Sequence, residues 1–318
     1  MRSIRENERL DKKFYSAYGL RLASDMEMPE LWIEEDDGTA ADVSIEYADL
    51  RGYIQKWEPD QKRQIDLAQN EIVLHIPDTG YYRIVDNSLI QVMPEEGADL
   101  REVRIFLLGV CLSILMVHRG MAPMHSSGVM IDEKAYIIVG DCGAGKSTLG
   151  AAFRQAGYKL ISDDIVGVTI DENNQLTAYP GYPQQKLWQQ SLDYLNMEAA
   201  NYSQILDNYA KFAVPFGDQF MKEPLPLAGI FELEKADIPH IEMRTLTSLE
   251  RIQLIRYHLF LGKVLNELNK EQWLLNFAAK AALAIPFYQL KRPVNGFTAP
   301  DLVNQIINTV REGEVVKL

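Results

Sequence analysis

The most constraining stretch of this sequence is a glycine-rich loop at residues 140–147, GDCGAGKS, set between two regular runs. The run before it, residues 135–139, is apolar and typical of a buried strand. The run after it, residues 147–156, favours a helix and ends at Gly157, a residue type that often terminates helices. A strand that turns through glycines into a helix predicts an α/β fold. The alternative, a glycine-rich turn that matches by coincidence, is disfavoured by the flanking strand and helix.

This spacing predicts a phosphate-binding loop that takes a nucleoside triphosphate. Glycines allow successive backbone N–H groups to face a polyphosphate at the start of a helix. Lys146 would reach the β- and γ-phosphates, and the Ser147 hydroxyl would bind Mg²⁺. The candidate binding residues are the loop and the residue after it: Gly140, Asp141, Cys142, Gly143, Ala144, Gly145, Lys146, Ser147 and Thr148.

Composition excludes several classes of protein. The chain has 318 residues and a formal net charge of −13, so a nucleic acid is not an expected partner. Its two cysteines, Cys111 and Cys142, are too few for a disulfide framework or a cysteine zinc site. The charged N-terminus does not resemble a signal peptide. The most apolar run, residues 105–117, is shorter than the ~20 residues that cross a bilayer. We therefore expect a soluble, cytoplasmic protein that does not enter a membrane.

The first hundred residues are expected to be rich in β-strands. Apolar and polar residues alternate over residues 42–47, 71–76 and 81–85, and turn sequences between the last runs predict antiparallel hairpins. A linker at residues 94–98 leads into a helix at 99–119. We expect a β-rich N-terminal domain over residues 1–95 and a domain containing the phosphate loop over 96–318, although that helix could pack against either.

The second half of the chain is expected to alternate strands and helices. A hairpin should feed the phosphate loop, and residues 179–226 should be irregular and contain a mobile segment that faces a substrate. The expected strands lie at 129–132, 135–139, 159–162, 166–170, 176–179, 228–234 and 287–290, and the expected helices at 147–156, 249–268, 271–284 and 299–312.

An acidic pair, Asp163 and Asp164, ends the first strand after the loop helix, seventeen positions beyond Lys146. With one helix between them, we expect this strand to return beside the strand that precedes the loop. One carboxylate could then hold Mg²⁺, and the other could accept the proton of an attacking hydroxyl. The alternative is a solvated turn or a helix cap, since aspartate is common in both.

Other candidates are weaker on sequence alone. His125 precedes the hairpin, but a lone histidine is more often structural than catalytic. Lys211, Arg251 and Arg256 could neutralise a phosphate, although charged residues on amphipathic helices usually face water. Aromatic residues could line a peptide groove or simply be buried: Tyr179, Tyr182 and Trp188.

Together these residues resemble the HPr serine kinase/phosphorylase family over roughly residues 121–235. The matching features are His125, the loop, Gly157 and the acidic pair. The resemblance implies an α/β protein of α+β character, with a P-loop HPr-kinase-like core built on a mixed sheet and a β-rich N-terminal domain. HPr kinases assemble as hexamers, but no feature of this sequence carries that over, so a homo-oligomer stays open. Thr148 and Leu149 stand where the bifunctional enzymes usually have Glu, which disfavours HPr as substrate. The later signature of those enzymes, which surrounds the phosphorylase chemistry, does not align with this chain, and this disfavours reverse phosphorolysis.

The whole chain is more similar to the HPr-kinase-like proteins found with lasso-peptide biosynthesis. The similarity lies at residues 15–20, 28–31, 124–128, 180–183 and 186–188. It implies transfer of phosphate from ATP, with Mg²⁺, to the C-terminal residue of a ribosomally made precursor peptide, with the N-terminal domain a candidate for recognising that peptide.

The resemblance also implies roles for individual residues. Lys146 would bind phosphates, Asp164 would be the general base, and Ser147 and Asp163 would hold the metal, although the sequence does not decide which aspartate does which. His125 would lie near the acidic pair and be a catalytic residue of the active site, together with Asp164 and Lys146. HPr, free serine or another small hydroxyl compound stays open as the acceptor, as does a nucleotide-sensing module without catalysis.

Overall fold

The computed structural model describes residues 12–55, 57–58, 61–67, 69–207 and 210–315. The chain divides into two compact units, Met1–Arg119 and Gly120–Leu318. This division falls after the helical segment that follows residue 95, whereas we expected it before that segment. The physical reason is that the segment packs on the N-terminal sheet, where Tyr82 Oη donates a hydrogen bond to Val103 O at 3.2 Å.

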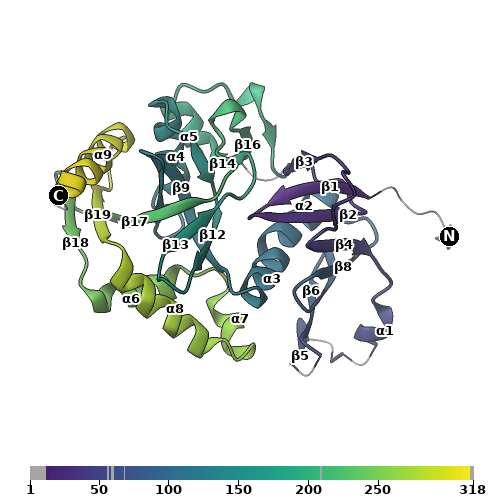
Figure 1. Ribbon diagram of the computed structural model, residues 1–318. Coiled ribbons are helices and arrows are strands. Elements are labelled where there is room, and N and C mark those ends of the chain that lie inside the picture. The colour runs from purple at the N-terminus through teal and green to yellow at the C-terminus, as the bar shows by residue number, and fades with distance from the viewer. Residues whose placement is uncertain (1–11, 56, 59–60, 68, 208–209, 316–318) are drawn as a thin grey trace. The chain divides into compact units, whose positions relative to one another are not determined.

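The N-terminal unit is built on one mixed sheet of eight strands, in the order β3-β1-β2-β4-β8-β7-β6-β5 (Figure 1). Two hairpins, β6–β7 and β7–β8, form where the turn sequences predicted them. The elements are β1 (Lys13–Ala17), β2 (Leu20–Ser24), β3 (Trp32–Glu34), β4 (Val43–Tyr47), α1 (Arg51–Ile54), β5 (Arg63–Asp66), β6 (Glu71–Ile76), β7 (Gly80–Val85) and β8 (Leu89–Pro94). The expected β-rich N-terminal part is confirmed.

The helical segment that follows is continuous but not uniform. It consists of α2 (Leu100–Phe106), a π-helical turn η1 (Leu107–Cys111) and α3 (Leu112–His118). Asp99 caps its start by accepting a hydrogen bond from the backbone N–H of Arg101 at 2.8 Å. Within the described part of the chain, no helix is both long and apolar enough to span a membrane.

The C-terminal unit is built on a second mixed sheet, in the order β10-β9-β12-β13-β17-β19-β18, with β11 also paired to β9. The sheet curves, because the long strand β17 pairs with β13 at its start and with β10 farther along. Its strands are β9 (Ala122–Ile131), β10 (Lys134–Val139), β11 (Leu160–Ser162), β12 (Ile165–Ile170), β13 (Leu176–Tyr179), β17 (Leu225–Ala236), β18 (Glu242–Thr245) and β19 (Phe287–Pro293). The expected α/β class with a mixed sheet is confirmed.

Helices cover this sheet in two groups. The loop helix α4 (Lys146–Gln155) packs with the last helix, α9 (Ala299–Val315), around buried residues that include Phe153, Phe231 and Ile306. The other group comprises α6 (Ser248–His258), α7 (Gly262–Glu267) and α8 (Glu271–Ala284), with α6 packed on α8 (Figure 1). The sequence predicted one helix over 249–268; the structure breaks it at Leu261, which has a left-handed φ of 64°.

The expectation that residues 179–226 are irregular is wrong. They contain a three-stranded antiparallel sheet, β14-β16-β15, whose strands are β14 (Gln184–Trp188), β15 (Ser203–Gln204) and β16 (Lys211–Pro215). Short helices accompany it: α5 (Gln189–Tyr194), η2 (Ala199–Asn201) and η3 (Gly217–Gln219). The sheet is ordered because alternate residues, among them Leu187, Phe212 and Val214, are buried in the same core as α4.

Candidate functional site

The glycine loop connects the end of β10 to the start of α4, as the sequence predicted. Gly140, Gly143 and Gly145 have φ values of 150°, 80° and 112°, which non-glycine residues rarely adopt. Gly145 occupies the position before the first residue of the helix. A Cβ at Gly140 would lie 2.4 Å from Leu233 O on the neighbouring strand β17. The loop therefore has this path only because glycine removes both backbone strain and a steric clash.

Gly140→Ala is expected to destabilise the protein by about 2 kcal/mol, because it combines an unfavourable φ with overpacking against a backbone atom. Gly157→Ala is the matched control: Gly157 also has positive φ, at 89°, but open space surrounds its Cβ position. That control should lose only about 1 kcal/mol. Urea denaturation of both variants checks this, and equal losses would contradict the clash at Gly140.

Lys146 lies folded over its own loop. Its Nζ donates hydrogen bonds to Gly140 O at 2.6 Å and to Asp141 O at 3.2 Å. The residue is only 8% exposed, and burial lowers the pKa of its ammonium group. The charge is thus held at the start of α4, where the helix dipole also favours an anion.

The strand order that brings the acidic pair near the loop differs from the expected one. Strand β11 does not pair with β10; β9 lies between them, paired with β10 on one side and with β11 and β12 on the other. The prediction that the two strands are neighbours is therefore wrong. Asp163 and Asp164 nevertheless line the same cavity as Lys146 and Ser147, because they lie in the short turn between β11 and β12.

Asp163 is almost completely buried, with 2% of its surface exposed. Its Oδ2 accepts a hydrogen bond from the Lys186 backbone N–H at 3.1 Å, while Oδ1 has no hydrogen-bond partner among the described residues. Burial raises the pKa of Asp163 to about 6, although the Lys186 N–H and the nearby Ser147 hydroxyl oppose that increase. An unpaired buried carboxylate oxygen is costly, so this atom is a strong candidate ligand for a cation.

Asp164 is held between two basic side chains. Its Oδ2 accepts a hydrogen bond from Lys186 Nζ at 2.8 Å, and its Oδ1 lies 3.5 Å from His125 Nδ1. Burial raises the pKa of Asp164, but Lys186, His125 and Lys211 together outweigh burial and hold it below its ordinary value. Its backbone φ is 92°, a strained conformation of the kind that recurs at functional sites. Asp164 is therefore a charged carboxylate with a fixed orientation.

His125 reaches Asp164 through the register of two strands. It pairs with Ile165 in the β9–β12 ladder, and the N–H of the following Ser126 donates to Asp164 O at 3.1 Å. Burial and the charge of Lys146 lower the pKa of His125 more than Asp164 raises it, which favours a neutral imidazole. Its buried Nδ1 has no hydrogen bond among the described residues; it lies 3.5 Å from Asp164 Oδ1, and this contact becomes ionic only when the imidazole is protonated.

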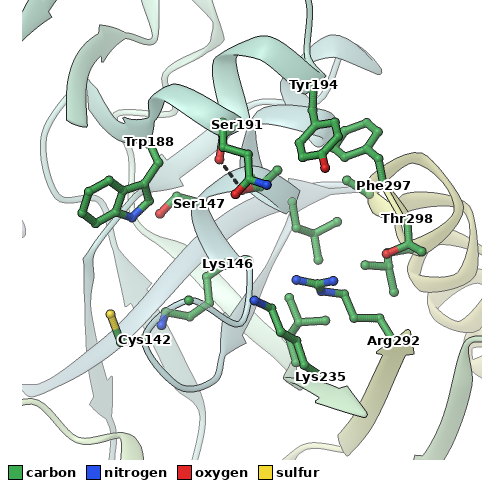
Figure 2. A pocket seen from close by; sticks show the side chains of 18 of the residues that line it. Cys142, Lys146, Ser147, Trp188, Ser191, Tyr194, Lys235, Arg292, Phe297 and Thr298 are labelled. Atoms are coloured by element: carbon green, nitrogen blue, oxygen red, sulfur yellow. Dashed lines mark hydrogen bonds between the residues drawn. The ribbon is translucent and has the colours of Figure 1, made fainter. Parts of the chain in front are cut away.

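The acidic pair, His125, Lys146 and Ser147 line one cavity of about 610 Å³. Figure 2 shows the part of this cavity around Lys146 and Ser147. Of the predicted loop residues, this cavity is lined by Cys142, Gly143, Gly145, Lys146, Ser147 and Thr148. Gly140, Asp141 and Ala144 line a second cavity of about 420 Å³ beside the loop. The first volume is within the range of about 300–1,000 Å³ typical of small-ligand sites.

The structure separates the weaker candidates into residues that line the first cavity and residues that do not. Lys211 lines the first cavity, with its Nζ 5.6 Å from the ring centroid of Trp188. Arg251 instead donates hydrogen bonds to Leu246 O, Ala282 O and Ile285 O, so it ties helices together. Arg256 is exposed and does not line either cavity. Among the aromatic candidates, Trp188 lines the first cavity, while Tyr182 is buried.

Sequence reasoning missed four residues of the site: Lys186, Tyr194, Arg292 and Phe297. Lys186 lies in a strand that was expected to be irregular, and the others come from segments far from the loop in sequence. Arg292 Nε donates to Ala144 O of the loop at 2.9 Å. For Arg292 the only signal in the sequence was a basic residue at the end of a strand. That pattern alone does not indicate a contact with the loop.

The residues present fit a magnesium–nucleotide complex. No group of three or more His, Cys, Asp or Glu side chains in the described parts of the chain could hold a metal alone. Mg²⁺ bound with a nucleotide does not need such a group, because phosphate oxygens and water supply most of its ligands beside one or two protein oxygens. Asp163 Oδ1 and the Ser147 hydroxyl offer those oxygens.

Comparisons with known proteins show a likeness to solved structures but none to a family model or a curated protein. No family model matches the sequence, and no curated protein matches it. Among solved structures, the chain is similar to the HPr(Ser) kinase/phosphatase from Coxiella burnetii, with 15% identity and a TM-score of 0.32, over 60% of this chain and 97% of that one.

Proposed function

We propose that the chain is a Mg·ATP-dependent kinase that transfers the γ-phosphoryl group to a Ser or Thr hydroxyl. The observation that carries this proposal is the meeting of two elements in one cavity. One is the phosphate loop with Lys146, and the other is Asp164, held by Lys186 and His125. A site that only bound nucleotide would not need a carboxylate oriented by two basic groups.

Each residue has a role that follows from its chemistry. The N–H groups of the loop and Lys146 would bind phosphates, with Lys146 exchanging its two carbonyl partners for phosphate oxygens. Ser147 and Asp163 would hold Mg²⁺, which when bound neutralises charge on the transferring group. Asp164 is placed to orient the acceptor hydroxyl and take its proton.

The reaction is a single displacement. The acceptor oxygen bonds to the γ-phosphorus, the bond from that phosphorus to the β–γ bridging oxygen breaks, and ADP leaves. The hydroxyl proton goes to Asp164, and neutral His125, 3.5 Å away, can receive it next. In a loose transition state, positioning and electrostatics matter more than a strong base. A carboxylate with a lowered pKa is compatible with this requirement, because it stays ionised and correctly oriented.

For the acceptor we propose the C-terminal residue of a lasso-peptide precursor. Trp188, 45% exposed, and Lys211 line the cavity at the acidic pair's end and provide an apolar face and a cation for a peptide. The resemblance of the whole sequence to lasso-associated kinases supports this choice. The proposed enzyme is cytoplasmic, and its net charge of −13 disfavours nucleic acid as a partner. HPr or free serine are the alternative acceptors.

Intact-mass analysis tests the function directly. The protein is incubated with Mg·ATP and, separately, a precursor peptide ending in Ser, HPr, or free serine, beside Lys146→Ala and Asp164→Asn. A phosphate-sized gain on the peptide alone, lost in both variants, is the expected result. Gain on HPr or serine would keep the kinase and overturn the substrate. ATP binding with no gain on any acceptor would contradict the kinase and favour a nucleotide-sensing module.

A further inference from the structure

A feature of the cavity that the proposed chemistry does not use is an aromatic pair at one side of the loop. Tyr194, the last residue of α5, and Phe297, in the connection between β19 and α9, stack with ring centroids 5.0 Å apart and planes inclined by 7°. Both line the cavity of about 610 Å³. Phe297 packs against the core, whereas Tyr194 is 47% exposed. The pair is thus an anchored aromatic platform with one side open.

The platform is fixed relative to the phosphate loop. Thr148 Oγ1 and Ser191 Oγ lie 2.8 Å apart, which joins the start of α4 to α5. Gln155 Nε2 donates to Leu195 O at 2.8 Å, which joins the end of α4 to the residue after Tyr194. Because α5 is tied to the loop helix at Ser191 and at Leu195, on either side of Tyr194, the position of Tyr194 relative to Lys146 and Ser147 is constrained. A ligand on the loop would find this ring preorganised.

The two ends of the cavity differ in charge. Trp188 pairs with Lys211 across the β14–β16 ladder, and Lys211 acts electrostatically on both Asp163 and Asp164. Trp188 therefore belongs to the acidic end, where phosphoryl transfer is proposed. The aromatic platform lies on the other side of Lys146 and Ser147 (Figure 2).

Arg292 contacts the loop and lines the same cavity as the platform. Its Nε donates to Ala144 O at 2.9 Å, and its Nη2 would be 3.5 Å from a Cβ at Gly145, next to the first turn of α4. This guanidinium places positive charge on the side of the loop away from the acidic pair. A polyphosphate whose last phosphate faces Asp164 would extend past Arg292 toward Tyr194.

We infer that the nucleotide has a single orientation in this cavity, with its base stacked on the open side of Tyr194 and its γ-phosphate toward Asp164. This inference rests on the proposed nucleotide-binding function and adds the subsite that takes the base. The platform suits a purine, because its two fused rings overlap an aromatic face more than a single ring does. The Tyr194–Phe297 pair thereby distinguishes a nucleoside triphosphate from a bare polyphosphate.

Calorimetric titration with two probes tests the subsite: Mg·ATP, and inorganic tripolyphosphate with Mg²⁺. Tyr194→Ala should weaken ATP about tenfold, as expected for one lost base stack, and leave the affinity for tripolyphosphate unchanged. Tyr194→Phe keeps the ring and should bind ATP like the wild type. Tyr47→Ala is the matched control, since Tyr47 is 41% exposed and does not line the cavity.

The remaining outcomes separate the subsite from the function. If Trp188→Ala loses ATP affinity and Tyr194→Ala does not, the orientation is reversed and the inference is overturned. If ATP and tripolyphosphate bind the wild type equally well and Tyr194→Ala changes neither, the phosphate site stands and the base subsite is wrong. If the wild type binds neither probe, the proposed function itself fails.

Discussion

Asp164→Asn is expected to lower the rate of phosphoryl transfer by about 10²–10⁴-fold, the usual contribution of a positioned acid or base. Asparagine keeps the size and shape of the side chain but cannot accept the proton of the hydroxyl. Lys186 and His125 also lose their charged partner, so the acceptor is no longer oriented by a fixed negative group. Because the phosphate loop is untouched, the affinity for Mg·ATP should change by less than about threefold.

The measurement is a time course of product mass, run beside calorimetric titration with Mg·ATP. Asp218→Asn makes the same chemical change at an exposed aspartate outside the cavity and should behave like the wild type. Transfer by Asp164→Asn at the wild-type rate would show that Asp164 is not the base. If Asp164→Asn instead lost ATP binding together with turnover, the carboxylate would belong to the nucleotide site.

The parts of the fold that depend on neighbours in sequence could be predicted from sequence. The strand, glycine loop and helix over residues 134–155 form as expected because glycine positions, apolar runs and a helix start occur within about twenty residues of one another. The hairpins at the ends of β7 form for the same reason, since turn residues directly join the strands that they pair.

Strand order and long-range partners could not be predicted in this way. The proximity of Asp164 to the loop was inferred from an assumed pairing of β11 with β10, yet β9 separates these strands. The expected proximity of Asp164 to the loop was therefore right, but the strand pairing from which it was inferred was wrong. Likewise, Lys186 is twenty-two positions beyond Asp164. No local sequence pattern indicates that a lysine in a short strand is the partner of a distant carboxylate.

Composition misled the expectation for residues 179–226. Proline, tyrosine and glutamine are common there, and such segments often form loops. Two short strands, β14 and β16, instead pair along their full lengths, and their buried residues face α4. In a strand of five residues, the alternation of buried and exposed positions is a weak signal for a strand. The composition of the segment was a stronger signal for a loop. Because the region was expected to be irregular, Lys186 and Tyr194, which it contributes to the site, were not predicted as site residues.

Lys186→Met is expected to destabilise the protein by about 3 kcal/mol, because it leaves a carboxylate without its partner at a largely buried position. The side chains of Lys186 and Asp164 are only 14% and 28% exposed. Burial lowers the pKa of Lys186, but Tyr182 and Asp164 raise it above its ordinary value, so the lysine is charged in the folded protein. Methionine preserves length and apolar contact and removes only the charge and the hydrogen bond. Urea denaturation measures the loss.

The double variant Lys186→Met/Asp164→Asn separates the ion pair from packing. Removing the carboxylate as well leaves no unpaired charge, so the double variant should recover most of the stability lost by Lys186→Met. If Lys186→Met and the double variant are equally unstable, the lysine contributes through packing, and the pairing with Asp164 has little effect on folding.

The pH dependence of the Lys186→Met defect follows from the sign of the shift at Asp164. In the wild type the pKa of Asp164 lies below its ordinary value, so the stability from its charged form is present above that ordinary value and is lost as pH falls through the lowered one. Without Lys186, burial is opposed only by the weaker effects of His125 and Lys211, and the pKa of Asp164 rises. The loss should therefore be largest at neutral pH and shrink in mild acid, where the buried carboxyl takes up a proton. A loss independent of pH would mean that the missing contact is not electrostatic, and His125 and Lys211 would then be the groups that hold the pKa of Asp164 below its ordinary value.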